Sequence, residues 1–513
     1  MSIYEPLEPQ NGRRLLQLRS PVTMENTQTL LCANREDVSA ALEKARSAQP
    51  AWQALSFEQR AAYMRKALKC VMERCDDIVE QVVAESGKAR ADAFTMEVWA
   101  SCDALCYYAK NARKFLKPET KRVHGVLGLT KKVKVNYKPL GVVGIIVPWN
   151  GAFILGMNPA VQAMMAGNTV LIKASEVTPF STRLIEEIFA EAGLPEGVLQ
   201  VILGDGETGA HLCQAGVDKI SFTGSVSTGQ KVAQACAEQL IPCTLELGGK
   251  DAMIVCHDAD LDRAASGAVI GSCMNTGHYC CGTERIYVAE DVYDEFVQKV
   301  VASVGELRQG SELGYEEDIG AVFWDRQLET IEEHVSDAVA KGANLLIGGE
   351  RNRSLPGLYY KPTVLTDVTH DMKIMRDETF GPIICIAKVK DEAEALRMAN
   401  DSVYGLHGNV WSRDTDRAVA LAEKVVSGGV SINDMAVGYG VPAAPFGGVK
   451  ESGLGRVNGE VGMRGYCHAV PIIIERFGGK KLPAGYPHSE KKVKGMKQFM
   501  RLLWGTPLGT WLS

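Results

Sequence analysis

The chain carries two linked segments, Thr244-Leu-Glu-Leu-Gly-Gly-Lys250 and Asn275-Thr-Gly-His-Tyr-Cys-Cys-Gly-Thr-Glu-Arg285, from which its architecture follows. Two adjacent cysteines lie between glycines and precede the apolar run Ile286-Tyr-Val288, so we expect a thiol on a turn. Glu246 stands between apolar residues and a Gly-Gly turn, which favours a buried strand end and a raised carboxyl pKa. Spacing alone does not bring Glu246 to Cys280, because only a fold can join them.

Four further segments accompany these two: Pro148-Trp-Asn150, Lys173-Ala-Ser-Glu176, Phe222-Thr-Gly-Ser225 and Glu378-Thr-Phe-Gly-Pro382. In this order and at these spacings the six segments resemble the aldehyde dehydrogenase superfamily, from about Asp37 to about Arg476. Any one segment alone would mean little. Within the superfamily, residues 246–255 and 430–434 are most similar to plant and fungal families twenty-two and fifteen, which include membrane-associated members.

The composition is that of a globular protein with several domains. The 513 residues are 46% hydrophobic and exceed the usual size of one core, so we expect two or three domains. The formal net charge of -6 gives no reason to expect a nucleic-acid partner. Fourteen cysteines without a CxxC pair argue against a zinc site and for a reducing compartment, and the first twenty residues show no apolar signal segment. We therefore predict a cytoplasmic protein without a metal.

The stretch from Pro139 to Ile172 contains no charged residue and is long enough to span a membrane. However, Pro148, Asn150 and Pro159 interrupt it, and the apolar pieces between them have the length of strands or short helices. We therefore predict a buried strand, turn and helix in place of a transmembrane helix.

Periodicity along the chain predicts an α/β fold. Helical spacing from about Asp37 to Lys117 indicates a helical layer. Apolar runs then alternate with helical windows, which is typical of parallel strands joined by crossover helices. The runs predict strands at 142–147, 169–173, 199–203, 219–222 and 244–247, and a second set at 252–256, 285–288, 360–365, 383–389 and 430–433. The first set has the order of a dinucleotide-binding domain.

The predicted architecture is therefore aldehyde dehydrogenase-like, with a Rossmann-type NAD-binding domain, an α/β catalytic domain and a small oligomerisation arm. Residues 1–120 and 139–248 are assigned to the NAD-binding domain, and residues 249–445 to the catalytic domain. Residues 121–138 and 464–476 form the predicted arm, since 131–137 alternate like a half-exposed strand and the family pairs such an arm with a neighbouring subunit. Residues 477–513 are a C-terminal extension.

The resemblance implies three catalytic residues. Cys280 is the nucleophile, because Asn-x-Gly-x-x-Cys selects it over Cys281, and thioester chemistry needs a polarizable thiolate. Asn150 and the Cys280 backbone N–H would stabilise the oxyanion, and Glu246 would activate water for hydrolysis of the thioester. Without the resemblance, Cys280 would be a buried inert thiol and Asn150 a turn residue.

The resemblance also implies NAD as the cofactor. Gly224-Ser-Val-Ser-Thr-Gly229 follows a strand and opens a helix, where free N–H groups favour a pyrophosphate, although alone it equally fits a simple turn. The Glu176 carboxylate would repel a 2′-phosphate, which favours NAD over NADP. The expected cofactor-binding residues are Trp149, Lys173, Ser175, Glu176, Gly206, Gly224, Ser225, Gly229, Glu378 and Phe380.

The substrate side departs from the common pattern of the family. Residues 151–159 read Gly-Ala-Phe-Ile-Leu-Gly-Met-Asn-Pro where many members have a shorter apolar segment and a lysine, and His278 replaces the usual glutamine. We predict NAD-dependent oxidation of an apolar aldehyde, a class that includes long-chain aldehydes, to its acid. The alternatives are a coenzyme-A-acylating enzyme, which generally lacks a glutamate like Glu246, and a catalytically retired ligand-binding member. The expected assembly is a homodimer or homotetramer.

The C-terminal extension is strongly basic, with seven Lys or Arg residues against Glu490. Val493, Met496, Met500 and Leu503 recur at spacings of three and four, which predicts one apolar stripe on a basic helix. Such a helix suits either an anionic membrane surface or a neighbouring subunit near the substrate opening, and the sequence leaves both open.

Overall fold

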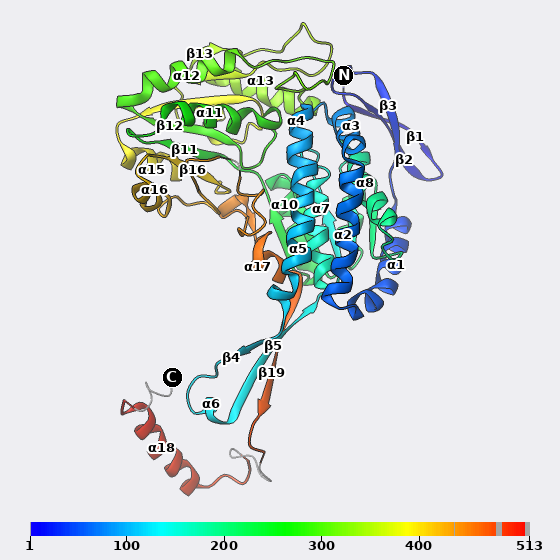
Figure 1. Ribbon diagram of the computed structural model, residues 1–513, viewed down its shortest axis with the longest axis vertical. Coiled ribbons are helices and arrows are strands. Elements are labelled where there is room, and N and C mark those ends of the chain that lie inside the picture. The colour runs from blue at the N-terminus through cyan, green and yellow to red at the C-terminus, as the bar shows by residue number, and fades with distance from the viewer. Residues whose placement is uncertain (1, 436, 479–484, 508–513) are drawn as a thin grey trace.

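Two parallel-stranded sheets form the body of the molecule, and a narrow three-stranded arm projects from it (Figure 1). The computed structural model describes residues 2–435, 437–478 and 485–507. The predicted α/β class is confirmed.

The first sheet has the strand order β18-β10-β9-β6-β7-β8. Its five parallel strands are β6 (Val142–Ile146), β7 (Thr169–Lys173), β8 (Leu199–Ile202), β9 (Lys219–Thr223) and β10 (Cys243–Glu246). Between them lie α7 (Ile154–Ala166), α8 (Pro179–Glu191), α9 (Gly206–Gln214) and α10 (Val226–Gln239). β18 (Gly453–Leu454) adds to β10 in antiparallel orientation, so this short late segment, which the prediction left unassigned, completes the sheet.

The uncharged stretch is a buried strand, turn and helix, as predicted. β6, α7 and β7 are buried along their whole length, because helices cover both faces of the parallel sheet. Over the residues that the structure describes, no helix is long and apolar enough to cross a membrane.

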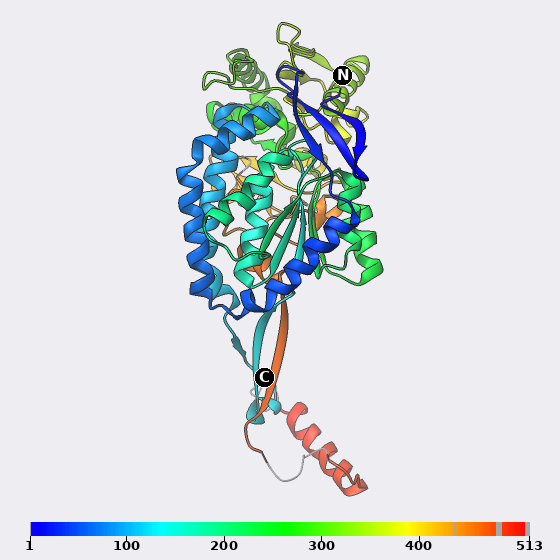
Figure 2. The same ribbon diagram turned by 90° about the vertical axis from the view of Figure 1, so that its right-hand side faces the viewer.

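The predicted helical layer covers the first sheet. It comprises α1 (Arg35–Ala54), α2 (Phe57–Glu73), α3 (Cys75–Ser86) and α5 (Ala100–Leu116), with α4 (Arg90–Asp92) and a π-helical turn (Ala93–Trp99) before α5. Capping boxes at Asn34 and Ser56 start α1 and α2 by satisfying their free N–H groups. In Figure 2 this layer lies beside the first sheet, and α5 and α2 contact α7.

The second sheet has the order β13-β14-β15-β12-β11-β16-β17. Its strands are β11 (Asp251–Val255), β12 (Thr283–Ala289), β13 (Asn344–Ile347), β14 (Thr363–Thr366), β15 (Ile383–Val389), β16 (Gly408–Trp411) and β17 (Ser431–Ile432). The helices are α11 (Leu261–Cys273), α12 (Tyr293–Gly305), α13 (Asp325–Ala340), α14 (Lys373–Arg376), α15 (Glu392–Asn400) and α16 (Thr415–Ala422). β14 begins three residues later than predicted, because Pro362 has no N–H for the ladder.

The sequence analysis missed the N-terminal sheet. β1 (Tyr4–Gln10), β2 (Arg13–Arg19) and β3 (Asn26–Leu31) pair antiparallel. Their apolar side chains pack against Phe180 and Leu203 of the first α/β unit. The sequence analysis missed these strands because polar residues interrupt their apolar pattern. Predicted residues 1–120 therefore contain a small sheet as well as helices.

The arm consists of β4 (Glu119–Lys121), α6 (Leu127–Thr130), β5 (Lys131–Pro139) and β19 (Cys467–Glu475). β5 pairs along its whole length with β19, so the predicted half-exposed strand is present and brings 131–139 beside 467–475. α17 (Gly459–Arg464) precedes β19, and α18 (Glu490–Trp504) lies beside the arm, away from the body (Figure 2). The predicted tail helix is thus present, whereas Lys480, Lys481, Leu508 and Trp511 lie outside the described residues.

Candidate active site

A tight left-handed turn presents Cys280 at the end of α11. Asn275 and Thr276 have φ of 56° and 57°, and Gly277 has φ of 75°. A Cβ on Gly277 would lie 2.0 Å from the Gly381 carbonyl oxygen, so only glycine fits this close approach. The turn leaves Cys280 half-buried in a cavity wall, while Cys281 is buried beside Leu406 and Phe446. The two adjacent thiols therefore occupy different environments.

Asn150 lies directly beside the cysteine turn. Its amide donates to the His278 carbonyl at 3.0 Å, and the Asn275 amide donates to the Asn150 carbonyl at 2.9 Å. Both asparagine side chains are buried, so this pairing fixes the first α/β unit against the second. The structure thereby joins two sequence segments that lie 125 residues apart.

A buried ion pair that the sequence analysis missed supports the Asn150 loop. The Lys88 ammonium lies 2.6 Å from Glu97 and donates to the Asn150 carbonyl at 3.0 Å. Glu97 in turn accepts from the backbone N–H groups of Phe153 and Ile154. Each charge is paired and hydrogen-bonded, as burial requires. In the sequence both residues stand in a helical stretch with many surface charges, so nothing distinguishes them there.

Glu246 ends β10 and faces the same cavity as Cys280. It is 5% exposed, and neither carboxylate oxygen has a hydrogen-bond partner among the described residues. Burial, and then the nearby Cys280 thiol, raise the pKa of Glu246 well above its usual value. The predicted raised pKa is therefore supported, and the carboxyl group is free to bind a water molecule.

Glu378 and Phe380 line the same cavity as Cys280 and Glu246. Glu378 accepts from the Gly249 N–H at 3.0 Å, and burial raises its pKa to about 8. Glu284, which pairs with Lys250, accepts from the backbone N–H of Phe380 at 2.9 Å. This contact secures Phe380, whose φ of 50° is unusual for a bulky residue.

His278 is a structural residue in this wall. Its Nε2 accepts from the Phe323 N–H at 3.3 Å, so Nδ1 is the protonated nitrogen and donates to the Phe380 carbonyl at 2.8 Å. Burial lowers the pKa of His278 to about 3, which keeps the ring neutral. Trp149, Phe323 and Phe380 surround the ring. Both ring nitrogens of His278 are thus hydrogen-bonded to backbone groups, which leaves the ring no role in proton transfer.

A cavity of about 550 Å³ runs along the carboxyl end of the first sheet. The predicted cofactor residues that line it are Trp149, Lys173, Ser175, Glu176, Gly206, Gly224 and Ser225. α10 starts at this wall, with Ser225 as its N-cap, so its free N–H groups and dipole suit a pyrophosphate. Gly229 is not part of the lining; it lies inside α10 against Leu247, where a Cβ would approach to 2.4 Å. Its role in this structure is helix packing.

Glu176 lines this cavity, and Cys280 does not. Its carboxylate is 3.5 Å from the Lys173 ammonium, which leaves the pair partly buried on the wall. A smaller cavity of about 190 Å³ shares Trp149 and Gly224 with the first and ends at Cys280, Glu246, Glu378 and Phe380. The shared residues connect the large cavity to the wall that contains Cys280.

A third cavity, of about 280 Å³, also reaches Cys280. Cys280 and Asn150 line both this cavity and the smaller one, so the thiol stands between two approaches. The remaining lining is mostly apolar, with no charged side chain among the described residues: Thr95, Met96, Ala100, Gly151, Ile154, Leu155, Met274, Tyr279, Val437, Tyr439, Gly440 and Val441.

The surroundings of Cys280 favour the protonated form of its thiol. A hydrogen bond with the Cys281 thiol and burial raise the pKa of Cys280 well above its usual value. Because the thiolate is the nucleophile, the thiol must lose its proton before reaction. Across the described part of the chain, no cluster of three His, Cys, Asp or Glu side chains could hold a metal ion.

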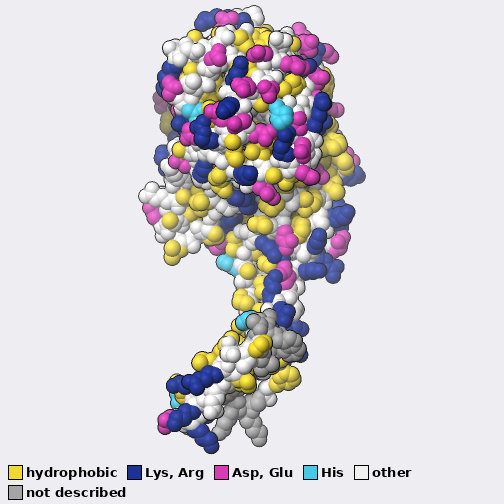
Figure 3. Space-filling model, turned by 90° about the vertical axis from the view of Figure 1, so that its left-hand side faces the viewer, with side chains coloured by type: hydrophobic (Ala, Val, Ile, Leu, Met, Phe, Trp, Pro, Cys, Tyr) yellow, Lys and Arg dark blue, Asp and Glu magenta, His cyan; other side chains and the backbone are white. Residues whose placement is uncertain are grey.

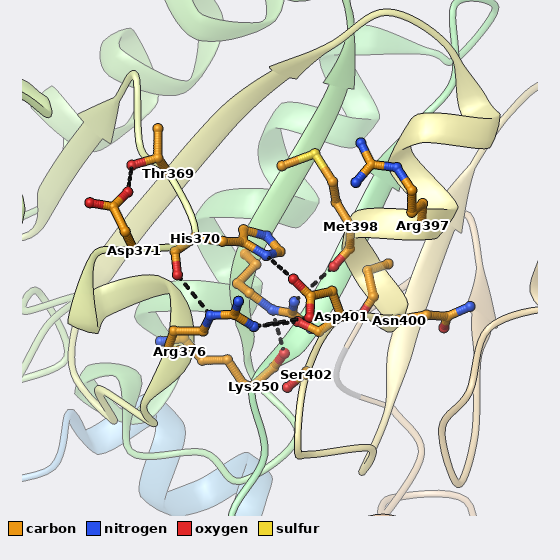
Figure 4. Close-up of polar contacts among 12 residues, drawn as sticks. Lys250, Thr369, His370, Asp371, Arg376, Arg397, Met398, Asn400, Asp401 and Ser402 are labelled. Carbon is orange, nitrogen blue, oxygen red and sulfur yellow. Dashed lines mark hydrogen bonds and ion pairs between the residues drawn. The ribbon is translucent and has the colours of Figure 1, made fainter.

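Arg285, which ends the cysteine segment, ties β12 to the C-terminus of α15. Its guanidinium donates to the carbonyl groups of Met398 and Ala399 at 3.2 and 3.0 Å, which are orphan acceptors of the last helical turn. Asp401 continues this cluster, since it lies between His370 and Arg376, at 2.8 and 3.1 Å (Figure 4). Arg285 is therefore structural.

Known proteins share the sequence pattern and the fold of this chain. The model of the aldehyde dehydrogenase family matches residues 7–471. The chain belongs to this family. Among curated relatives, 4,4'-diapolycopene aldehyde oxidase from Methylomonas sp. is 36% identical over 90% of this chain and 86% of its own length. A putative succinate-semialdehyde dehydrogenase [NADP(+)] from Mycolicibacterium smegmatis is 37% identical over 93% of this chain and 92% of its own.

Solved structures show the same aldehyde dehydrogenase fold. The Mycobacterium tuberculosis aldehyde dehydrogenase complexed with NAD+ has a TM-score of 0.86 and 35% identity, and covers 93% of this chain and 97% of that chain. The NAD-dependent enzyme from Sinorhizobium meliloti has a TM-score of 0.87 and 33% identity, with 94% of both chains covered. This protein is thus an aldehyde dehydrogenase by family, and the named relatives include both NAD and NADP enzymes.

Proposed function

We propose that this protein oxidises an apolar aldehyde to the carboxylic acid, with NAD as the preferred cofactor and a covalent acyl intermediate on Cys280. The observation that carries the proposal is the position of Cys280 in the wall of two cavities. One continues into the dinucleotide-shaped cavity, and the other is apolar. The aldehyde and the nicotinamide can therefore reach the thiol through separate cavities.

The residues divide the chemistry between them. The Cys280 thiolate adds to the aldehyde carbonyl, and the oxyanion lies within reach of the Asn150 amide and the Cys280 backbone N–H. NAD, when bound, supplies the hydride acceptor. Glu246, which has two free oxygens, then takes a proton from a water molecule as that water attacks the thioester. The carboxylic acid leaves, and the thiol regains a proton.

Glu176 supports the preference for NAD. Its carboxylate lines the adenosine side of the large cavity, 3.5 Å from Lys173. A carboxylate there can accept hydrogen bonds from ribose hydroxyls, whereas a 2′-phosphate would meet like-charge repulsion. Glu378 and Phe380 complete the nicotinamide side of the proposed site.

The lining of the third cavity selects the substrate class. Met96, Leu155, Met274 and Val441 offer apolar contact, and among the described lining residues no cation could pair with a substrate carboxylate. The cavity therefore suits an aliphatic or polyene aldehyde, the class that includes the substrate named for the Methylomonas relative, better than succinate semialdehyde.

We further propose that α18 holds the enzyme at an anionic membrane surface. Val493, Met496, Met500 and Trp504 are 46–70% exposed, while Leu503 is buried. Within residues 485–507, one of the five basic side chains, Lys494, pairs with an acid, Glu490. Figure 3 shows the basic side chains of this tail gathered along its edge, far from the body. The resemblance to the membrane-associated plant and fungal branch supports the same proposal.

The arm supports assembly into a homodimer or homotetramer. Ile472, Ile473 and Ile474 of β19 are exposed on an edge strand, and an apolar edge of this kind favours pairing with another chain. Sedimentation of the full chain would give the oligomer size.

Rapid mixing of the enzyme with NAD and an apolar aldehyde tests the proposed chemistry. Cys280→Ala should bind NAD and form no NADH, whereas Cys281→Ala, the matched control, should turn over. Glu246→Gln should release about one NADH per active site in a fast burst and then stall, with the acyl-enzyme visible by mass spectrometry. Turnover by Cys280→Ala would overturn the assignment, and a steady state that requires coenzyme A would indicate an acylating enzyme instead.

A further inference from the structure

A line of polar side chains runs behind Glu246 on one face of the first sheet. Lys219 and Ser221 alternate along β9, and Thr244 and Glu246 alternate along β10, so each pair points to one side of its strand. The parallel register sets Thr244 opposite Ser221 and Glu246 opposite Thr223. All four side chains are at least nine-tenths buried. The sheet thus places a row of hydrogen-bonding groups inside the protein.

Lys219 is an unusual member of this row, because it is a buried cation without a carboxylate. It is 3% exposed, and no acidic side chain in the described residues forms an ion pair with it. Its ammonium donates to the Thr244 hydroxyl at 2.7 Å and lies 5.3 Å from the centre of the Tyr466 ring. The other titratable groups that face it are the thiols of Cys236 and Cys243.

The cost of this burial changes how Lys219 titrates. Burial lowers the pKa of Lys219 to about 8, so the amine can gain and lose a proton near neutral pH. An unpaired buried ammonium is expensive, and the reaction described above gives Lys219 no task. The hydrogen bond to Thr244 places the Lys219 ammonium beside β10, the strand that ends at Glu246.

Several polar atoms around Glu246 have no hydrogen-bond partner among the described residues. Its oxygens have no partner, and the Tyr466 hydroxyl, which lies beside Ser221, has no well-aligned hydrogen bond either. The titratable and charged groups that face Glu246 are Cys280, Arg456, Tyr439 and Tyr466. Buried polar atoms of this kind are normally satisfied by water, which can bridge the gap between Glu246 and Thr244.

We propose that Lys219 accepts the proton that Glu246 takes from water, and that the proton passes between them through the Thr244 hydroxyl and ordered water along β9 and β10. The inference rests on the proposed function, since it takes Glu246 as the base of deacylation. The proton leaves the attacking water for Glu246, passes along the row to the neutral Lys219 amine, and is then released to solvent. No electrons are transferred. Lys219 and Thr244 are positioning residues, because neither touches the substrate.

Thr244→Val and Thr244→Ser form the matched pair of variants that tests this route. Valine keeps the shape of threonine without the hydroxyl, whereas serine keeps the hydroxyl. Thr244→Val should slow deacylation about tenfold, a part of what a general base contributes, and leave the NADH burst rate unchanged. Thr244→Ser should deacylate within about twofold of the wild type. Deacylation at wild-type rate in Thr244→Val, or equal slowing in both variants, would overturn the proposal.

The pH profile of deacylation separates a proton route from a packing role, and it decides the matter if Thr244→Val fails to fold. In the wild type the rate should rise with pH through a step near 8, because Lys219 must be neutral to accept the proton. Lys219→Met, which fills similar space without an amine, should lose that step. An unchanged step in Lys219→Met would overturn the proposal. Glu246→Gln distinguishes failure of the Lys219 route from failure of the proposed function. If this variant shows no burst followed by a stall, Glu246 is not the base of deacylation.

Discussion

A carboxylate at the far end of the substrate should lower kcat/KM by at least about a hundredfold. Butanal and succinate semialdehyde form a matched pair, because both are four-carbon aldehydes and differ in the group at the far end. The apolar cavity at Cys280 has no cationic partner for that carboxylate in the described lining. Burial of an unpaired carboxylate costs several kcal/mol, and about 2.7 kcal/mol already corresponds to a factor of a hundred.

The same cavity sets the dependence on chain length. Each methylene that enters it should stabilise the bound transition state by about 0.8 kcal/mol, which is roughly a fourfold gain in kcat/KM. From butanal to octanal, four methylenes therefore predict a rise of about two hundredfold. The gain should level off once the chain fills the 280 Å³ cavity.

Initial rates of NADH formation at aldehyde concentrations well below KM measure both effects. Met96→Arg should add a cation to the half-buried rim of the cavity and narrow the gap between butanal and succinate semialdehyde at least about tenfold. Met96→Leu is the control and should leave the gap unchanged. A wild-type enzyme that uses succinate semialdehyde as well as butanal would refute the reasoning from the lining.

Three further outcomes are expected. Glu176→Gln should reduce the preference for NAD over NADP about tenfold, measured as the ratio of kcat/KM values, because like-charge repulsion is removed; a wild type that prefers NADP would contradict it. A chain ending at Phe477 should no longer co-sediment with anionic vesicles, whereas the full chain should bind them and be released by salt. If neither chain binds vesicles and the truncated chain has a different oligomer size, the tail packs on a neighbouring subunit instead. Burial raises the folded-state pKa of Glu246, so the stability that its protonated form provides is lost as pH rises through that pKa. Glu246→Gln should therefore have a higher melting temperature than the wild type, by a margin that widens from pH 5 to pH 9. A margin that is constant or shrinks would contradict the assigned pKa.

The sequence predicted the architecture well where the physics is local. The strands of both sheets are apolar runs, because helices cover both faces, and the uncharged stretch before Ile172 proved to be β6, α7 and β7. Six spaced segments sufficed to indicate the family. Elements with weak periodicity were missed, including the N-terminal sheet and β16, whose Gly408-Asn-Val-Trp411 has no apolar run.

Contacts between distant residues required the tertiary structure. The sequence marked Cys280, Glu246 and Asn150 separately, but the folding of two sheets against each other placed them around one cavity. It also showed that Gly229 packs on Leu247, although its position in the turn suggested cofactor binding. Lys88 and Lys219 look like ordinary charged residues in the sequence, and their burial depends on what covers them. Periodicity reports which face of a helix or strand is apolar, whereas the partners of Lys88 and Lys219, which include Asn150 and Thr244, are set by tertiary packing.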